Sequence, residues 1–407
     1  MRTVLHCLLA PALALLWLAG AAAAGPPNYP FGSHRQPYAA GVLSPGVTPA
    51  AADRATADFY DAWKRRYLEP GCVAGDWRVK ADTYSGAWVV SEGQGYGMVI
   101  VALMAGHDPA ARAIFDGLHR YNKRHPSRHD PDLLAWAQNA DCENILNADS
   151  ATDGDLDVAY GLLLADMQWG SAGDVDYAAE AAKVIAAIER RNLNPETKIV
   201  NLGDWVTASD PPRYYYGTRS SDWMLGHFRA FAKRQPVWTR ALAAHQRLIA
   251  TLQSRYAPHT GLLPDFVVDT QATPRPAPRG YLEARTDGSY SWNACRTPWR
   301  IGIDAATSGD PRSRAAALKM SRWIRARTKG DPKRIAASYS LAGSPIERGN
   351  DMAFIGPFAV AAMLDRGGQA WLDALWREMV ERPPSEYYGD SLKLMSMLAL
   401  SRNWLTP

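Results

Sequence analysis

Apolar residues return at a helical spacing along almost the whole chain. From about residue 49 onward they recur every three or four positions with charged residues between them, which is typical of amphipathic helices. Alternating β-branched residues, which would indicate strands, are scarce. The pattern predicts about a dozen helices, at residues 49–67, 94–106, 109–123, 153–168, 175–192, 219–233, 237–255, 298–308, 311–328, 351–364, 369–381 and 387–402.

These helices are predicted to form one domain, at residues 49–407. The connections carry Gly, Pro, Asp and Asn, are alternately short and long, and include no linker long enough to separate two domains. The Pro-rich stretch 271–279 is a loop insertion, since aromatic and charged residues resume directly after it. Sequential antiparallel helix pairs can close into a ring with the long loops at one end. An irregular two-layer helical domain is the alternative.

The first 24 residues have the pattern of a secretory signal peptide. Arg2 supplies the positive end, Leu8 to Leu18 is nearly all apolar, and small residues precede Gly25. The apolar core is too short for a comfortable membrane span. We therefore expect a secreted or periplasmic protein with no membrane contact after cleavage. Residues 25–48, rich in Pro, Gly and Ser, are expected to form an extended lead-in.

Neither the cysteines nor the acidic clusters indicate a metal site. Cys72, Cys142 and Cys295 remain after removal of the leader, and their spacings match no zinc motif. Three cysteines form at most one disulfide, for which Cys72 with Cys142 is the candidate pair. An Asp-x-Asp-x-Asp pattern at 153–157 resembles the start of a calcium loop, but Gly and Glu are missing at its sixth and twelfth positions.

Composition narrows the ligand class. The chain has 15 Trp and 18 Tyr but only 8 Phe. Trp and Tyr join a large apolar face to a polar group, which suits the faces and edges of a sugar ring. Ordinary packing of core and rim aromatics is the alternative. The net charge of +4 is too small and too dispersed to indicate nucleic-acid binding.

Three clusters carry the candidate chemistry. Residues 91–98 read SEGQGYGM at the start of an apolar helix, with Ser91 as the expected N-cap and Glu92 beside it. Glycines in a helix cost roughly 1 kcal/mol each against Ala, so something is expected to approach this backbone closely. Residues 151–157 read ATDGDLD and place three carboxylates together. Residues 281–304 interleave aromatic and charged side chains more densely than any other segment.

Together these segments resemble glycoside hydrolase family 8. The resemblance rests on SEGQGYGM, on ATDGDLDVAYGLLLAD and on YLE…DG…WNACRTPWRIGID, in the family's order, with TRSSDWMLGHFRAF at 218–231 as a further segment. It covers about residues 50–400. The family comprises exported bacterial endoglucanases, lichenases, chitosanases and some xylanases. Membership implies an (α/α)6 barrel, which agrees with the helices counted independently, and hydrolysis with inversion.

The resemblance also assigns the catalytic residues. Glu92 matches the general acid, and Asp153 matches the acid that binds and distorts the sugar at the cleavage point. One branch of the family uses an Asp as base where this chain has Asn293, which cannot take a proton from water. The branch of chitosanases and lichenases has the Asn and uses a loop Glu instead, and Glu283 fits that position. Asp265, Asp269 and Asp287 are the alternatives if Glu283 is not the base.

An inverting mechanism sets requirements on the distance and the pKa values of Glu92 and Glu283. The two carboxyl groups are expected roughly 6.5–9.5 Å apart, with water between base and sugar. Burial or the charge of Asp153 should raise the pKa of Glu92. Glu283, on a solvated loop near Arg285, is expected to be the more acidic partner.

Further residues near the motifs are predicted to bind substrate, the aromatic ones mostly by stacking. This set is Tyr96, Trp136, Asp155, Trp205, Tyr215, Tyr290, Trp292, Asn293, Arg296 and Trp299. Rim packing is the alternative for each aromatic residue.

The sequence thus favours a monomeric, exported endo-β-1,4-glucanase, or cellulase, that cuts a linear β-glucan. A chitosanase or a lichenase is the alternative within the family, although the slightly basic chain disfavours polycationic chitosan. A sugar-binding protein that has lost catalysis is the alternative from another class, suggested by Asn293. Acid–base hydrolysis needs no cofactor, and none is expected.

Overall fold

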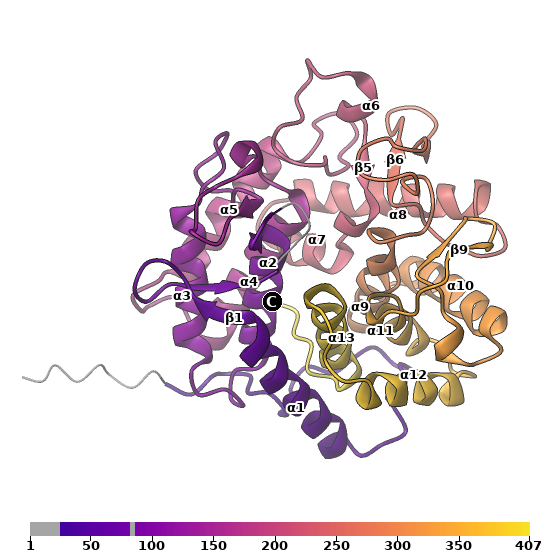
Figure 1. Cartoon of the computed structure of the whole chain (residues 1–407), viewed down its shortest axis with the longest axis horizontal. Helices are drawn as coiled ribbons and strands as arrows, with labels where there is room; N and C mark the ends of the chain where they lie inside the picture. The colour runs from indigo at the N-terminus through magenta and orange to yellow at the C-terminus, as the bar shows by residue number, and fades with distance from the viewer. Residues whose placement is uncertain (1–24, 82–85) are drawn as a thin grey trace, which may run out of the picture.

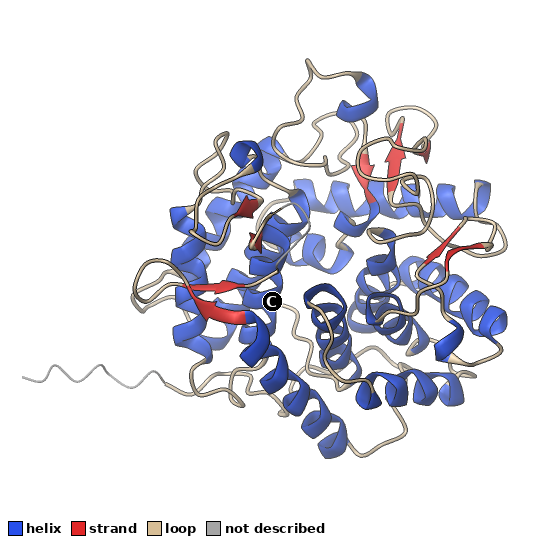
Figure 2. Cartoon of the chain, in the orientation of Figure 1, coloured by secondary structure: helices blue, strands red, loops and turns tan. Residues whose placement is uncertain are grey.

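The computed structural model describes residues 25–81 and 86–407, so the predicted signal peptide at 1–24 lies outside the described residues. Helices dominate, as Figure 2 shows. They are α1 (Pro49–Tyr67), α2 (Ser91–Leu103), α3 (Ala111–Arg124), α4 (Thr152–Trp169), α5 (Tyr177–Arg191), α6 (Pro212–Tyr215), α7 (Leu225–Ala232), α8 (Val237–Arg255), α9 (Thr297–Ser308), α10 (Pro311–Thr328), α11 (Met352–Ala362), α12 (Gln369–Glu381) and α13 (Tyr387–Leu400).

Short antiparallel strands occur only in the connections of the described chain. β1 (Leu68–Pro70) pairs with β2 (Trp77–Val79), and β3 (Val89–Val90) pairs with β4 (Ala137–Gln138). β6 (Phe266–Val268) lies between β5 (Thr218–Arg219) and β7 (Arg275–Pro276). β8 (Ser338–Tyr339) pairs with β9 (Pro345–Glu347).

The helices form two concentric rings, which Figure 1 shows from one end. The inner helices touch in the closed order α2, α4, α7, α9, α11, α13 and back to α2. Each inner helix also contacts an outer one, which is α3, α5, α8, α10, α12 and α1 in the same order. All residues of α11 are buried, whereas α10 and α12 bury one face, as expected for inner and outer positions. The predicted (α/α)6 barrel is confirmed.

Most predicted helix boundaries agree with the structure. Residues 49–67, 237–255, 311–328 and 369–381 are helical over the predicted ranges. The helix predicted at 219–233 is wrong in its first turns, because Thr218 and Arg219 pair with Val267 and Phe266 in a sheet. A 3-10 turn at Ser220–Asp222 follows, and α7 begins only at Leu225. The four-residue helix α6 was not predicted.

The glycines of residues 91–98 serve the packing of α2. A Cβ at Gly95 would lie 2.7 Å from Cβ of Asp157 on α4, and a Cβ at Gly93 would lie 2.8 Å from Oη of Tyr387 on α13. Neighbouring helices therefore make the close approach that the sequence predicted. The N-cap prediction is wrong: Val90 is the cap, and Ser91 is the first helical residue.

One hydrophobic core extends from Tyr38 to Leu405 through both rings. A smaller apolar cluster, which includes Leu202, Phe266 and Tyr281, lies under the long loops. No helix in the described part of the chain has the length and apolar character needed to cross a bilayer.

The candidate disulfide is present between Cys72 and Cys142, which are 70 positions apart in the sequence. Cys295 is a free, buried thiol. A cross-link over such a long segment lowers the chain entropy of the unfolded state.

Removing this disulfide should destabilise the protein. We expect the double variant Cys72→Ser/Cys142→Ser to lose about 2–4 kcal/mol of unfolding free energy in urea titrations, because its unfolded chain is no longer constrained. Wild-type protein kept in reducing agent should match the double variant. An unchanged urea midpoint in both samples would contradict the expectation.

Candidate active site

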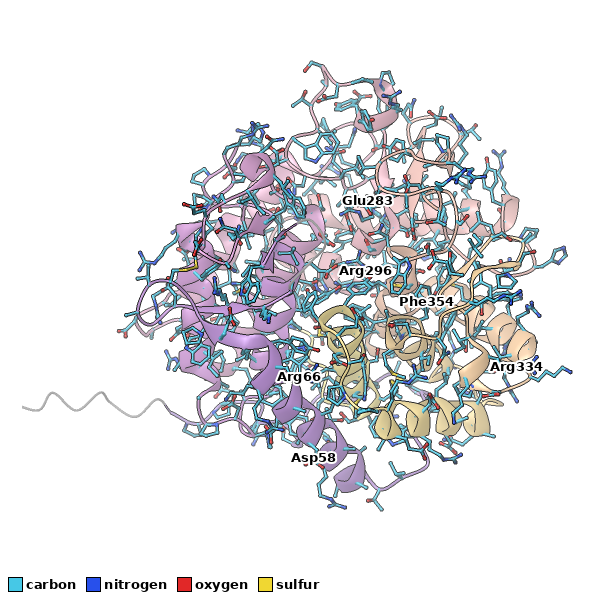
Figure 3. All side chains as sticks on the ribbon, viewed as in Figure 1. Asp58, Arg66, Glu283, Arg296, Arg334 and Phe354 are labelled. Carbon is cyan, nitrogen blue, oxygen red and sulfur yellow. A yellow bond between two sulfur atoms is a disulfide. The ribbon has the colours of Figure 1, made fainter. Side chains whose placement is uncertain are left out.

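The candidate catalytic residues meet where the inner helices begin. Glu92 and Asp153 are the second residues of α2 and α4, Arg296 directly precedes α9, and Tyr387 is the first residue of α13. Backbone N–H groups and the positive ends of the helix dipoles face the same region, which favours carboxylates there. Glu283 and Arg296 lie near the centre of the face shown in Figure 3.

Arg296 connects three of the predicted residues. Its Nη1 donates to Oε2 of Glu92 at 2.5 Å and to Oδ2 of Asp153 at 2.9 Å. Its Nη2 donates to Oδ1 of Asn293 at 2.9 Å. The Arg296 side chain is only 3% exposed, so one buried guanidinium fixes two carboxylates and an amide relative to one another.

Glu92 has the electrostatics of a proton donor. Burial raises the pKa of Glu92, Arg296 opposes that shift, and the nearby Asp153 adds to it. Oη of Tyr387 donates to Oε1 of Glu92 at 3.0 Å, which lowers the pKa of Glu92. The balance is upward, as predicted from the sequence.

Glu283 lies on the loop after β7, and its side chain is 43% exposed. Nη2 of Arg219 donates to Oε1 of Glu283 at 2.7 Å, and Nδ2 of Asn293 donates to Oε2 at 2.8 Å. Both partners are donors, and the natural acceptor of two donors is a carboxylate. Asn293 and Arg296 stand between Glu283 and Glu92, whose separation of roughly 6.5–9.5 Å stays a prediction.

Arg219 corrects the predicted surroundings of Glu283. Arg285 was expected beside this carboxylate but is exposed, and Arg219 makes the ion pair instead. Nη1 of Arg219 also lies 3.9 Å from Oδ1 of Asp153, so Arg219 bridges the base candidate and the sugar-binding candidate. The pairing of β5 with β6 brings Arg219 to the loop of Glu283, although the two residues are 64 positions apart in the sequence.

Two of the alternative bases hold loops in place. Asp287 accepts backbone N–H groups of Leu282, Glu283 and Ala284 at 2.7, 3.1 and 2.7 Å. Asp265 accepts those of Ser291, Asn293 and Ala294 at 3.0, 3.2 and 2.7 Å. Both are buried, and Asp269 is paired with Arg275 at 2.6 Å. The two buried carboxylates position Glu283 and Asn293, and none of the three competes with Glu283 as a free base.

Asp222 is a buried acid of the site that sequence reasoning missed. Oγ of Ser221 donates to its Oδ1 at 2.7 Å, while its Oδ2 has no hydrogen-bond partner among the described residues. Burial and the nearby Asp153 raise the pKa of Asp222 to about 7, against the pull of Arg219. Its position directly after Arg219 and two serines, inside a recognised family segment, was the available signal.

A second Asp–Arg ion pair lies one helical turn below the pair formed by Asp153 and Arg296. Asp157 and Arg300 follow Asp153 and Arg296 by four residues, and Arg300 donates to both oxygens of Asp157 at 2.9 and 2.5 Å. His227 contacts Asp157 at 2.8 Å. Burial disfavours the ionised form of Asp157, but Arg300 and His227 lower its pKa to about 2. This pair joins α4, α7 and α9 beneath the site.

The predicted sugar-binding residues divide by exposure. Trp292 is 39% exposed, and Trp136, Trp205 and Asn293 are partly exposed. Trp292 donates from Nε1 to Oε2 of Glu347 at 2.9 Å and packs edge-on against Phe354. These residues can still present a ring or an amide to a sugar.

Six other members of that predicted set are buried. Arg296 is one of them and binds the carboxylates of Glu92 and Asp153, and for the remaining five the prediction that they contact sugar is corrected. Asp155 accepts from N–H of Leu134 and from Asn192, and Tyr290 packs against Phe354 and Phe358. The Trp299 ring lies 3.9 Å from the Arg300 guanidinium. Their surfaces are used by packing: the five are Tyr96, Asp155, Tyr215, Tyr290 and Trp299. Tyr96 still borders the site, since Arg296 donates to its hydroxyl at 3.3 Å.

One group of metal-ligating side chains lies outside the centre, in loops 127–150 and 201–206. His129, Asp149 and Asp204 approach one another there. Nε of Arg128 already donates to Asp149 at 2.7 Å, and Asp204 accepts from Ser127 and from N–H of Ser150. The guanidinium supplies the positive charge that a metal would bring, so we assign no metal to this group.

The chain is similar to known proteins over most of its length. The family model described as glycosyl hydrolases family 8 matches residues 37–402. A "Beta-glucanase" of Niallia circulans is 41% identical over 97% of this chain and 95% of its own length. An "Endoglucanase" of Bacillus sp. (strain KSM-330) is 36% identical over 90% of this chain and 80% of its own. The apo structure of a β-1,3-1,4-glucanase from Paenibacillus sp. X4 is 41% identical, with a TM-score of 0.90, and covers 94% of this chain and 100% of its own.

Proposed function

The chain belongs to glycosyl hydrolases family 8 and is a glycoside hydrolase, and we propose that it is an endo-acting β-glucanase that cuts internal β-1,4 bonds with inversion. The observation that carries the mechanism is the chain of contacts from Glu92 through Arg296 and Asn293 to Glu283. It joins the mostly buried carboxyl of Glu92, whose pKa is raised, to the exposed carboxylate of Glu283 without direct contact between the two.

The two carboxyl groups divide the reaction between them. Glu92 donates its proton to the glycosidic oxygen as the bond to the anomeric carbon breaks. Glu283 takes a proton from a water molecule whose oxygen attacks that carbon from the opposite face. Asp153, held by Arg296 and Arg219, lies beside Glu92 and is placed to bind the sugar at the cleavage point. Water adds across the bond, and the anomeric configuration inverts.

Several observations favour a β-glucan as substrate. The relatives above are named as glucanases, and the relative with a solved structure is named for mixed β-1,3-1,4 linkages. Mixed-linkage glucan is therefore the second candidate substrate. Arg219 and Arg296 are paired with Glu92, Asp153 and Glu283, which leaves little unbalanced negative charge to attract polycationic chitosan.

Reducing ends released from carboxymethylcellulose, lichenan and chitosan, measured side by side, test this proposal. We expect release from the two glucans and a rapid fall in the viscosity of carboxymethylcellulose, because an endo-acting enzyme shortens chains early. Release from chitosan alone would contradict the glucan assignment. No release from any of the three would contradict the enzymatic proposal.

Export is part of the same proposal. The leader-like composition of residues 1–24 supports it, and a disulfide between Cys72 and Cys142 suits an oxidising compartment. Sequencing the N-terminus of protein recovered outside the cytoplasm should show a start near Gly25. Protein that retains Met1 would contradict it.

The variant Tyr387→Phe should shift the pH profile upward. The Tyr387 hydroxyl donates to Glu92 and favours its ionised form, so its removal raises the pKa of Glu92 further. The protonated acid then persists to higher pH, and the alkaline limb of kcat/KM moves to higher pH. The variant Tyr388→Phe, whose hydroxyl instead donates to O of Trp292, is the control. An unchanged or lowered alkaline limb in Tyr387→Phe would contradict this role.

A further inference from the structure

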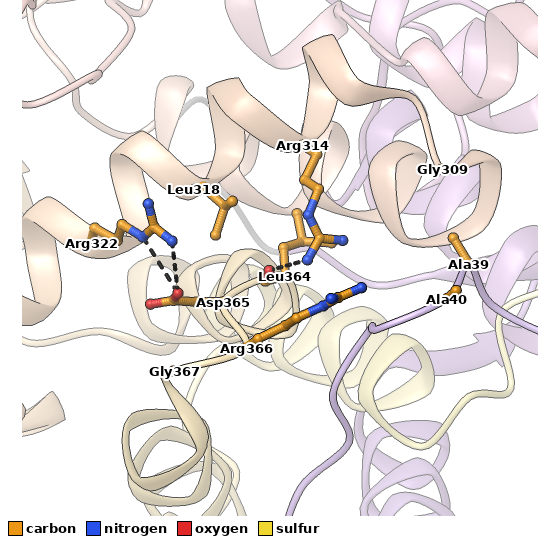
Figure 4. Close-up of a pocket in the computed structure, with 10 residues that line it drawn as sticks. All are labelled: Ala39, Ala40, Gly309, Arg314, Leu318, Arg322, Leu364, Asp365, Arg366 and Gly367. Atoms are coloured by element: carbon orange, nitrogen blue, oxygen red, sulfur yellow. Dashed lines mark hydrogen bonds and ion pairs between the residues drawn. The ribbon is translucent and has the colours of Figure 1, made fainter.

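A second recessed site lies between outer helix α10 and the turn from α11 to α12, which we call the α10 groove. Its larger part has a volume of about 600 Å³ (Figure 4). The residues that line this part are Ala39, Ala40, Gly309, Arg314, Leu318, Arg322 and residues 364–367. A second part of about 480 Å³ shares Arg322 and Asp365 and continues to Lys329 and Trp371. Gly309 follows α9, whose other end carries Arg296, so roughly 18 Å of helix separates the groove from the catalytic residues.

The α10 groove is strongly basic. Residues 311–334 include nine Lys or Arg and one acid, Asp331, against a net charge of +4 for the whole chain. Four of these cations, at positions 314, 322, 325 and 329, line the groove on the side of α10. Arg366 lines the opposite wall. Asp365 is the one acid of the lining and is already bridged by Arg322 at 3.0 Å and Arg325 at 3.6 Å.

Several donors of the groove lack an acceptor. Within residues 25–81 and 86–407, the side chains of Lys329 and Arg366 have no hydrogen-bond or ion-pair partner. Both side chains are exposed, so they are free to pair with an incoming ligand. Two unpaired cations in one basic recess suit a ligand that brings negative charge and acceptor oxygens.

We propose that the α10 groove binds a linear anionic polysaccharide that carries a carboxylate on successive sugars. Cations placed about one to two helical turns apart suit charges that repeat along a chain better than a single ion. Leu318, Ala326 and the Ala39–Ala40 segment provide apolar surface for the faces of sugar rings. A membrane surface fits less well, because interfacial helices pair basic residues with exposed apolar ones, and no exposed large apolar side chain of the described chain lies on α10.

Binding of polygalacturonate, measured by calorimetry with the mature chain at low salt, tests the proposal. The variant Arg366→Glu/Lys329→Glu reverses two unpaired cations of the groove. The variant Arg327→Glu/Arg334→Glu is the matched control, since it changes the net charge equally at exposed positions that do not line the groove. Arg334 lies at the edge of the molecule in Figure 3. We expect the Kd to rise about tenfold or more in the groove variant and much less in the control.

Other results decide against the proposal. Equal weakening in both variants would mean attraction by net charge alone. Binding of neutral pullulan as tight as that of polygalacturonate would remove the role of charge. Binding to vesicles of anionic lipid or to a short RNA, without binding to polygalacturonate, would assign the groove to that ligand instead. Release of reducing ends from lichenan should be unchanged in both variants, so a failure of this proposal is distinct from a failure of the proposed hydrolysis.

Discussion

Replacing Glu92 by Gln is expected to lower kcat/KM on a soluble β-glucan by about three orders of magnitude. Gln has nearly the same shape and keeps one oxygen that can accept from Arg296, while its NH2 group can donate to the Tyr387 hydroxyl. It has no acidic proton to give to the leaving oxygen. The fold and the affinity for oligosaccharide should therefore be retained. The loss should fall on kcat, because proton donation is needed only in the transition state.

A substrate with a good leaving group separates this role from a merely structural one. An aryl glycoside with an acidic phenol needs little protonation on departure, so Glu92→Gln should be far less impaired on it than on a natural glucan. Glu381→Gln, at an exposed position on α12, is the matched control and should keep full activity. Equal losses on both substrates, or a loss below tenfold on glucan, would contradict the role of Glu92 as general acid.

The architecture could be predicted closely because its main signal is local. An outer helix such as α10 buries one face and exposes the other, and this periodicity fixed its ends at Pro311 and Thr328. The structure departs from the predicted helix at residues 219–224, because Arg219, together with Thr218, forms a strand whose partner is more than 40 positions away. A helical period in one segment carries no information about a distant pairing partner.

The acidic residues of the site could be predicted from the sequence, but most of the side chains around them could not. Glu92, Asp153 and Glu283 lie in recognisable segments, and the structure connects them through Arg296, Asn293 and Arg219. Asp155 was predicted to bind substrate, and it lies two residues after Asp153. Two residues along a helix rotate a side chain by about 200°, and Asp155 accordingly lies buried on another side of α4.

The aromatic residues show the same limit. Trp292 and Trp299 are seven positions apart in one dense segment, yet the first is 39% exposed and the second is fully buried. Trp292 precedes the 3-10 turn Ala294–Arg296, whereas Trp299 lies inside α9 and faces the ring of inner helices. The high density of aromatic residues identifies the segment from the sequence. The path of its backbone decides which of those rings a sugar can reach.

Glu283→Gln should be nearly as damaging as Glu92→Gln, with a loss of about 10²- to 10⁴-fold in kcat. Gln at position 283 keeps one oxygen, which can accept from Arg219, and loses the acceptor for Asn293. The loop that Asp287 holds should persist, but no group remains to take the proton from water. The matched control is Glu347→Gln, which contacts Trp292 rather than the catalytic carboxylates.

Azide distinguishes the base from the acid. Azide is a nucleophile that needs no deprotonation, so it should restore turnover to Glu283→Gln and yield a glycosyl azide of inverted, α configuration. It supplies no proton to the leaving oxygen, so it should not restore Glu92→Gln. NMR of early wild-type products should likewise show the α-anomer. A β-anomer would indicate a retaining enzyme, in which a carboxylate about 5 Å from Glu92 attacks the sugar directly, and the assignment of Glu283 as base would then be wrong.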